Sequence, residues 1–266
     1  MDWNLTENYG RTVTYPSSSS AYYTAVPVGG VGIKSSYVEI IDSTPFPTSE
    51  IWLFFRGETD YDYKSYVMDV AIGAAGSEVI VLPNLFFYTG YVLDGLYCLP
   101  FYVPEGSRVS VRGTTYSSGH EVYTNIMLWE QGSRYGQHDT LSVCKDYGTN
   151  IYVNYFGTTF THANDDEWGS WQLLAPVTHF TSKAIMSPLY SNYPYDTIVQ
   201  IGVGLPGYEQ PVLSLMCNED YYTMQQLNCP TPIFPISIKE GETVSIRSKT
   251  ISGNSGTFSG RVYILK

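Results

Sequence analysis

The side chains that could support acid-base, nucleophilic or metal chemistry are scattered along the chain. None of the histidines belongs to an HExxH or His-x-His pattern, the spacings that place two imidazoles on one metal ion. They are His120, His138, His162 and His179. No G-x-S-x-G sequence marks a nucleophilic serine, and the glycine-rich segments near Gly29 and Gly202 lack the Gly-Lys-Ser/Thr ending of a phosphate-binding loop. The sequence therefore predicts no catalytic residue, no cofactor site and no transition-metal site.

Two acidic clusters come closest to a functional site. Asp60 and Asp62 lie in "ETDYDY", and Asp165 and Asp166 lie in "NDDE". Loop carboxylates can bind calcium, or can act as the acid-base pair of a glycoside hydrolase. Neither cluster has the spaced D-x-D-x-D-G pattern of a calcium loop, which favours solvated side chains. We expect a non-enzymatic protein. Enzymatic degradation of a polysaccharide is a weaker hypothesis.

Tyrosine is the other candidate for function, with 25 copies in 266 residues. Its large apolar ring and polar tip suit protein interfaces and also stacking on sugars. Because no cleft of Asp, Asn and Arg recurs beside the aromatics, the sequence favours protein contact. The predicted interface residues lie in segments with loop signals and are Tyr15, Tyr22, Tyr23, Tyr61, Tyr63, Tyr190, Tyr193, Tyr221 and Tyr222.

The chain contains an internal repeat. Four blocks recur in the same order at offsets of roughly 131 to 138 residues, which predicts two copies of one domain. The clearest pairs are "VMDVAIGAAGSE" with "IVQIGVGLPGYE", and "PFYVPEGSRVSVR" with "PISIKEGETVSIR". Between the copies, the polar "EQGSRYGQHDT" is a candidate boundary. We expect an N-terminal arm over residues 1–20, a first repeat over 21–136 and a second repeat over 137–266.

Short apolar runs separated by Gly, Pro, Ser and Asp clusters predict an all-β chain. In "RVSVR", Val109 and Val111 alternate with polar residues, as in a strand with one buried face. The recurring glycines predict structural turns at Gly73, Gly76, Gly106, Gly204, Gly207 and Gly241. We therefore expect two tandem antiparallel β-sandwich domains of jelly-roll-like form, with an immunoglobulin-type topology as the alternative.

Composition restricts the classes of partner. A formal charge of −11 and the absence of a basic run argue against nucleic-acid binding. No apolar run approaches the length of a membrane span, and the N-terminus shows no secretory signal, so we expect neither membrane insertion nor export. The cysteines show no CxxC spacing, which predicts reduced and mostly buried thiols at Cys98, Cys144, Cys217 and Cys229.

The blocks "VMDVAIGAAGSE" and "PFYVPEGSRVSVR" resemble segments of virion structural proteins of tailed bacteriophages. The second copy is similar more loosely, with Gln200 for Asp69, Tyr208 for Ser77, and Glu242 with Thr243 for Ser107 with Arg108. The resemblance implies a β-sandwich module of the particle without catalytic residues. We expect a capsid decoration or cement protein, located in the virion after assembly in the host cytoplasm. The expected partners are major capsid or tail subunits and further copies of the chain. The alternative is a tail-associated module that recognises a host glycan.

Overall fold

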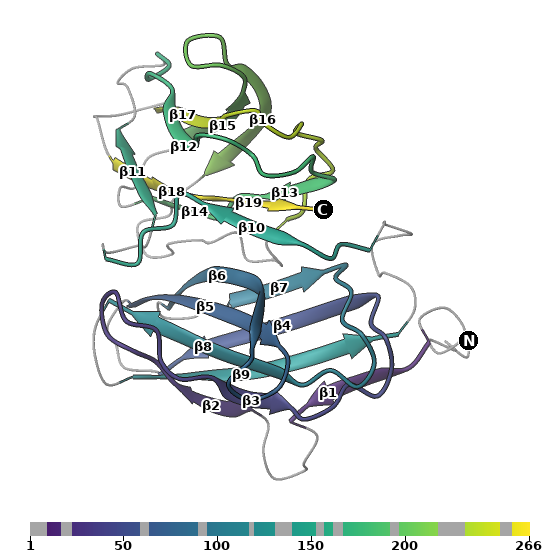
Figure 1. The fold of residues 1–266 in the computed structure, drawn as a ribbon. Helices are drawn as coiled ribbons and strands as arrows, with labels where there is room; N and C mark the ends of the chain where they lie inside the picture. The colour runs from purple at the N-terminus through teal and green to yellow at the C-terminus, as the bar shows by residue number, and fades with distance from the viewer. Residues whose placement is uncertain are drawn as a thin grey trace, which may run out of the picture. The chain divides into compact units, whose positions relative to one another are not determined.

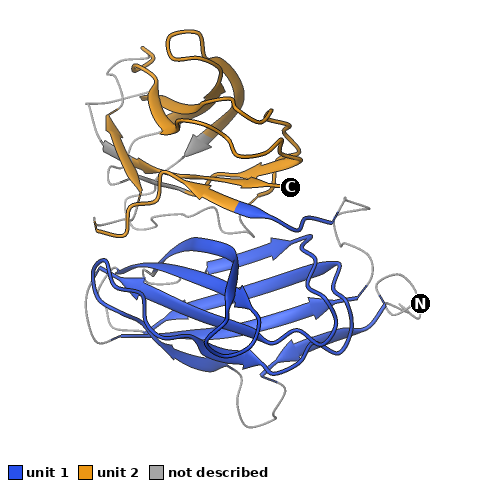
Figure 2. Cartoon of the chain, viewed as in Figure 1, with its two compact units in different colours: residues 1–144, 229–231 blue, residues 145–228, 232–266 orange. Residues whose placement is uncertain are grey.

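The computed structural model describes residues 10–16, 23–58, 64–89, 95–116, 120–130, 140–152, 157–161, 167–191, 197–217, 232–250 and 257–266. All regular secondary structure in these residues is β-strand, in several antiparallel sheets (Figure 1), which confirms the predicted all-β class. The chain divides into two compact units (Figure 2). Of the described residues, 10–144 belong to the first unit and 145–266 to the second.

The first unit is built from two antiparallel sheets. The larger has the order β1 (Thr12–Tyr15), β9 (Glu121–Trp129), β4 (Glu50–Gly57), β7 (Gly95–Leu99), with β2 (Thr24–Pro27) also paired to β9. The smaller has the order β3 (Val38–Ile41), β8 (Val109–Thr115), β5 (Lys64–Ile72), β6 (Val79–Thr89). Buried aromatics join the sheets: the ring of Phe87 on β6 lies 5.6 Å from that of Phe55 on β4 and 4.9 Å from that of Tyr66 on β5. This is the core of a sandwich.

The second unit has one four-stranded sheet and two three-stranded sheets. The four-stranded sheet has the order β12 (Gln172–Ala175), β17 (Val244–Thr250), β15 (Thr197–Val203), β16 (Gln210–Cys217). The others are β10 (Cys144–Tyr147), β19 (Val262–Leu265), β13 (Ala184–Met186), and β11 (Thr158–Thr161), β18 (Thr257–Gly260), β14 (Leu189–Ser191). A buried apolar cluster that includes Phe160, Ile201, Ile246 and Ile264 draws residues from all three sheets.

The four-stranded sheets of the two units share their strand order, and two of their three strand pairings share their register. Both have a bulge at the same point of the edge pairing. The paired residues are Val38 with Val111, Glu39 with Ser110 and Ile41 with Val109 in the first unit, and Gln172 with Ile246, Leu173 with Ser245 and Ala175 with Val244 in the second. The central pairings agree as well, since Ile72 faces Val109 and Val203 faces Val244. Two copies of one domain would give this pattern. Strand register is set by the sequence of the strands and turns, so similar sequences pair in the same register.

Part of the predicted N-terminal arm is a strand. Within residues 1–20, which we expected to be irregular, Thr12–Tyr15 form β1 and pair with Ile126 to Trp129 of β9. The β-branched residues of "TVTY" suit this half-buried edge position. Residues 1–9 and 17–20 of the predicted arm lie outside the described residues.

The first unit extends to Cys144, beyond the expected end at residue 136. Leu141 accounts for the difference, because its amide donates to the Pro100 carbonyl at 2.6 Å and its carbonyl accepts from the Tyr102 amide at 2.7 Å. Its side chain is also buried. A single apolar residue after a polar segment was too weak a signal to place the boundary.

An ion pair next to β1 holds this strand against β9. Arg11 Nε and Nη2 donate to the two carboxylate oxygens of Glu130 at 2.9 and 2.7 Å, and the Arg11 amide donates to the same carboxylate at 3.0 Å. The Arg11 side-chain hydrogen bonds, followed by the Arg11 amide, lower the pKa of Glu130 from 4.5 to about 2. The charged form of Glu130 is thus the form that stabilises this edge.

We expect NMR titration of the Glu130 carboxyl carbon to give a pKa near 2 in the folded protein. Because the folded pKa lies below the unfolded one, the contact stabilises the fold above about pH 4.5 and is lost as the pH falls through about 2. Amide protection of β1 should fall over the same range, and Glu130→Gln should remove that pH dependence. A Glu130 pKa of about 4.5 would contradict this account of the edge.

Candidate functional site

The six glycines predicted to form turns all have positive φ: Gly73, Gly76, Gly106, Gly204, Gly207 and Gly241. In the β5–β6 turn, Gly73 has φ 120 and Gly76 has φ 82. A Cβ at Gly73 would lie 2.9 Å from the Ser77 carbonyl oxygen, so this position excludes larger residues by contact as well as by conformation. The β15–β16 turn has the same form, with Gly204 at φ 134 and Gly207 at φ 87. These glycines shape the backbone.

Two buried hydroxyls in each unit tie the crossover between sheets to the Glu-Gly turn. Thr44 Oγ1 donates to the Pro104 carbonyl at 2.6 Å and accepts from the Ser107 amide at 2.9 Å. Thr48 Oγ1 donates to the Phe101 carbonyl at 2.9 Å and accepts from the Val103 amide at 2.8 Å. Thr48 therefore satisfies the buried Val103 amide and Phe101 carbonyl, and Thr44 reinforces the hydrogen bond that the Ser107 amide donates to the Pro104 carbonyl.

The second unit repeats the hydroxyl ties. Thr178 Oγ1 donates to the Lys239 carbonyl at 2.6 Å. Ser182 Oγ donates to the Ile236 carbonyl at 2.9 Å and accepts from the Ile238 amide at 2.7 Å. Sequence reasoning did not single out these residues, although a hydroxyl recurs at both positions in "TPFPT" and "THFTS". These recurring hydroxyls are the sequence signal that could have identified the four residues.

One of the sequence differences between the two units preserves a contact. Arg108 Nη1 donates to the Gly73 carbonyl at 3.3 Å, and its guanidinium also pairs with Glu39 and Glu78. In the second unit the hydroxyl of Thr243 donates to the corresponding carbonyl, that of Gly204. A charged contact in one unit and a neutral contact in the other therefore hold the same turn.

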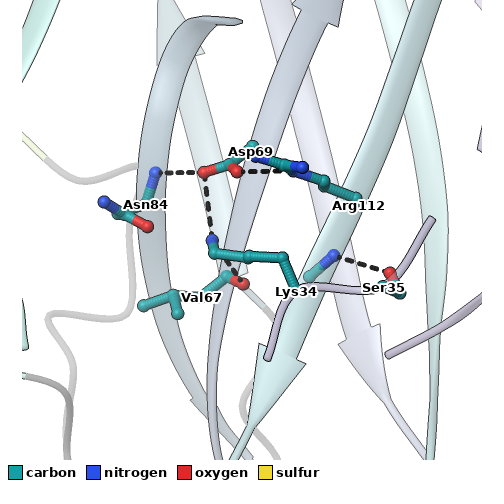
Figure 3. Close-up of polar contacts among 7 residues, drawn as sticks. Lys34, Ser35, Val67, Asp69, Asn84 and Arg112 are labelled. Atoms are coloured by element: carbon teal, nitrogen blue, oxygen red, sulfur yellow. Dashed lines mark hydrogen bonds and ion pairs between the residues drawn. The ribbon is translucent and has the colours of Figure 1, made fainter. Parts of the chain in front are cut away.

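A buried carboxylate organises the outer face of the first four-stranded sheet (Figure 3). The side chain of Asp69 on β5 is 4% exposed and accepts from Lys34 Nζ and from Arg112 Nε, each at 3.0 Å. The Arg112 guanidinium lies 4.5 Å from the centre of the Tyr37 ring. Burial raises the pKa of Tyr37, and the nearby Arg112 opposes that shift. This cluster joins two strands to the segment before β3.

Asp69 also completes the hydrogen bonding of a bulge in β6. The β5–β6 register shifts between Met68 and Val70, so Asp69 has no direct partner on β6. Asn84 has φ 50, and its amide donates to Asp69 Oδ1 at 2.9 Å. The preceding residue is proline, which has no amide hydrogen to give. The carboxylate therefore replaces a backbone acceptor, a structural use of an acidic side chain.

The equivalent face of the second unit has different chemistry. Gln200 takes the place of Asp69, and its Oε1 accepts from Arg247 Nε and Nη2 at 2.9 and 2.8 Å. The Arg247 guanidinium lies 4.7 Å from the ring centre of Trp168 and 4.2 Å from that of Trp171. Burial is the largest influence on the pKa of Arg247 and lowers it, while the charge of Glu209 acts in the opposite direction. Trp168, Trp171, Gln200 and Arg247 are named the aromatic–arginine face below.

Few of the predicted interface tyrosines have described side chains. Tyr15 ends β1 and is half-buried, and Tyr23 is 49% exposed with its ring 4.3 Å from that of Tyr123. The backbone of Tyr190 lies on β14, where this residue is paired in register with Ser259 of β18. Tyr22, Tyr61, Tyr63, Tyr193, Tyr221 and Tyr222 lie outside the described residues, as do Asp60, Asp62, Asp165 and Asp166.

Three further observations concern possible chemistry. Cys98 and Cys144 are buried. The described part of the chain contains no group of three or more His, Cys, Asp or Glu residues arranged to hold a metal ion. Nor does that part contain a helix with the length and apolar character needed to cross a membrane.

Comparisons with known proteins give weak likenesses only. No family model and no curated protein matches the chain. Among solved structures, N-glycanase F (PNGase F) is 10% identical with a TM-score of 0.45, over 96% of each chain. Tripeptidyl peptidase 2 is 12% identical with a TM-score of 0.29, over 97% of this chain and 23% of that one. The PBSX exported protein XepA is 9% identical with a TM-score of 0.26, over 97% and 87%. Likenesses at this level assign neither a fold family nor a function.

Replacing Thr48 by Val should lower the free energy of unfolding of the first unit by about 1–3 kcal/mol, because the Val103 amide and the Phe101 carbonyl lose their buried partner. Thr48→Ser, which keeps the hydroxyl, is the matched control and should retain most of the stability. Denaturant titration of both variants checks this. A loss for Thr48→Val no larger than that for Thr48→Ser would contradict the role given to the hydroxyl, because Thr48→Val is the variant that removes it.

Replacing Asp69 by Asn should lower the free energy of unfolding by about 3–5 kcal/mol. The change removes the carboxylate that pairs with both Lys34 and Arg112, and it leaves two cations without a counter-charge in a largely buried cluster. Glu240→Gln, at an exposed turn position, is the control and should change stability by less than about 0.5 kcal/mol. The same denaturant titration measures both. A loss for Asp69→Asn as small as that of the control would overturn the structural role of the cluster.

Proposed function

We propose that the chain is a non-enzymatic structural protein of a bacteriophage particle, attached to the outside of the shell as a capsid decoration or cement protein. The resemblance of "VMDVAIGAAGSE" and "PFYVPEGSRVSVR" to segments of phage virion proteins supports the particle role. So does the use of polar side chains in the described residues: Asp69, Arg108, Thr44 and Thr48 all bind the protein's own turns and strands. Such a module contributes rigidity and surface to an assembly.

The observation that carries this proposal is the apolar end of the β15–β16 hairpin. Leu205 is 71% exposed and Tyr208 is 78% exposed, on a turn whose backbone is fixed by Gly204 and Gly207. The equivalent positions of the first unit are Ala74 and Ser77, which are small. Large apolar side chains on a rigid exposed turn gain free energy when a partner surface covers them. This hairpin end is therefore a candidate attachment point.

Cementing requires that one molecule bridge neighbouring shell subunits. Burial of apolar surface at each contact contributes about 25 cal/mol per Å2 before the cost of ordering is subtracted. The proposed partners are major capsid subunits, with tail subunits as the alternative, and further copies of this chain. The proposed location is the virion, which assembles in the host cytoplasm.

A second candidate function is recognition of a host glycan by a tail-associated module. The loop tyrosines that could stack on such a glycan lie mostly outside the described residues. The specific observation in its favour is the aromatic–arginine face of the second unit, where two indoles flank a guanidinium. Activity against a polysaccharide has no comparable support in the described residues.

The attachment point can be tested with particles from which the protein has been removed. We expect the double variant Leu205→Ser with Tyr208→Ser to rebind such particles at least about tenfold more weakly than the wild type, because it loses most of the exposed apolar surface of the turn. Cosedimentation with the particles measures this. Tyr152→Ser, which removes a ring that is 70% exposed elsewhere in the same unit, should bind normally.

Heating the particles tests the cementing role separately. Stripped particles should release their genome at a lower temperature than intact ones, and rebinding of the wild type should restore the difference. Unchanged heat resistance after stripping would refute cementing. Normal rebinding by the double variant would refute the hairpin end as the attachment point.

A further inference from the structure

The two four-stranded sheets carry an arginine at the same register position and differ in what surrounds it. Arg112 faces Asp69 across β5 and β8, and Arg247 faces Gln200 across β15 and β17. In the first unit the arginine shares a buried carboxylate with Lys34. In the second unit the carboxylate is replaced by an amide, which is neutral. One face is thus an internal ion cluster, and the other presents a cation.

The positive charge of Arg247 is only weakly compensated. Among the described residues, no carboxylate lies within ion-pair distance of this guanidinium. Lys249, two residues further along β17, adds a second cation, with its Nζ 5.5 Å from the centre of the Trp168 ring. The guanidinium is partly desolvated by the indoles, so an anion placed against it is attracted more strongly than in water.

The donors of Arg247 are fixed in direction. An arginine has five N–H donors, and Gln200 Oε1 accepts from Nε and from one hydrogen of Nη2. No described residue accepts from Nη1. Gln200 is in turn held by a 3.1 Å hydrogen bond from its Nε2 to Ser214 Oγ. The guanidinium therefore keeps a fork of donors for a planar acceptor such as a carboxylate.

The indoles are also held in place. The Gly169 amide, between the two tryptophans, donates to the Ser248 carbonyl at 3.0 Å, which fixes the segment against β17. The six-membered ring of Trp171 lies directly over Gly202, where a Cβ would come within 2.5 Å of its Cη2 atom. Both tryptophans are half-buried, so each keeps part of its ring accessible. Rigid aromatic surface beside fixed polar groups is the usual composition of a small-molecule site.

We propose that the aromatic–arginine face is a binding site for a saccharide that carries a carboxylate, such as a uronic or sialic acid residue. Arg247 binds the carboxylate through its remaining donors, and the C–H face of the sugar ring packs on Trp168, because the six-membered ring of Trp171 already lies against Gly202. Gln200 is a positioning residue that orients the guanidinium, and Lys249 adds attraction at longer range. This site is independent of the proposed particle attachment, which depends on Leu205 and Tyr208.

The chemistry of the face favours an acidic sugar over other anions. An inorganic anion would use Arg247 but would leave the indoles without a role. A single-stranded nucleic acid stacks on aromatic rings, but it brings one charge for each nucleotide and needs a groove lined with many cations. This chain has a formal charge of −11, which repels such a polyanion beyond the local cations. A mostly neutral glycan with one carboxylate can pair with Arg247 and is repelled much less by the negative charge of the chain.

The test is calorimetric titration of the whole chain with two probes, a tetrasaccharide that contains one glucuronic acid and sialyllactose, each also in its carboxyl-reduced form. We expect at least one acidic probe to bind and its reduced form to bind at least about tenfold more weakly. Arg247→Lys, which keeps the charge but loses the fork, and Trp168→Ala should each weaken binding by about tenfold or more. Arg112→Lys, the matched change in the first unit, should leave binding unaltered.

Thermal unfolding of each variant separates loss of the site from loss of the fold, and the reduced sugars test the carboxylate in the unaltered protein. The proposal is overturned if neither acidic probe binds, if reduced and acidic forms bind equally, or if Arg247→Lys and Trp168→Ala bind as the wild type does. It is also overturned if a short single-stranded oligonucleotide binds more tightly than the acidic sugars, since that result would assign the face to nucleic acid.

Discussion

The hydrogen bonds of the buried hydroxyls are the constraint on which each unit depends. In the first unit, residues 42–49 lead from the four-stranded sheet to the five-stranded sheet, and residues 100–108 lead back. Thr44 and Thr48 join these two crossovers through backbone groups, and those bound by Thr48 are buried. Thr178 and Ser182 do the same in the second unit. Once the crossovers are joined, the strand that follows the Glu-Gly turn has a fixed start and therefore a fixed register.

A fixed frame allows the outer faces to differ. Asp69 in the first unit satisfies a bulge and two cations, and this makes its face part of the scaffold. Gln200 in the second unit is neutral and leaves the charge of Arg247 in place. The Arg247 guanidinium packs against the rings of Trp168 and Trp171. The hairpin ends differ in the same way, with Ala74 and Ser77 in one unit and Leu205 and Tyr208 in the other. The first unit thus resembles a pure scaffold, and the second presents surfaces suited to partners.

The sequence predicted the parts of this structure that depend on local chemistry. The all-β class and the strand after each Glu-Gly pair follow from alternation and turn residues, which act over a few positions. Strand β1 and the role of Leu141 depend on pairing with distant residues, so the local pattern did not show them. The sequence pattern did not show the aromatic–arginine face, because Trp168 and Trp171 meet Gln200 and Arg247 only through the pairing of distant strands. The predicted interface consists of tyrosines instead, which are more numerous in the sequence.

Native-state hydrogen exchange of the Val103 and Ile238 amides tests the central claim most directly, because these amides donate to Thr48 and Ser182 within the crossovers. If the hydroxyls fix the frame, both amides exchange only when their own unit unfolds, with protection equal to that of the central strands β8 and β17. Exchange at the rate of an exposed loop, with β8 and β17 still protected, would show that the crossovers open freely and that the frame is held by other contacts.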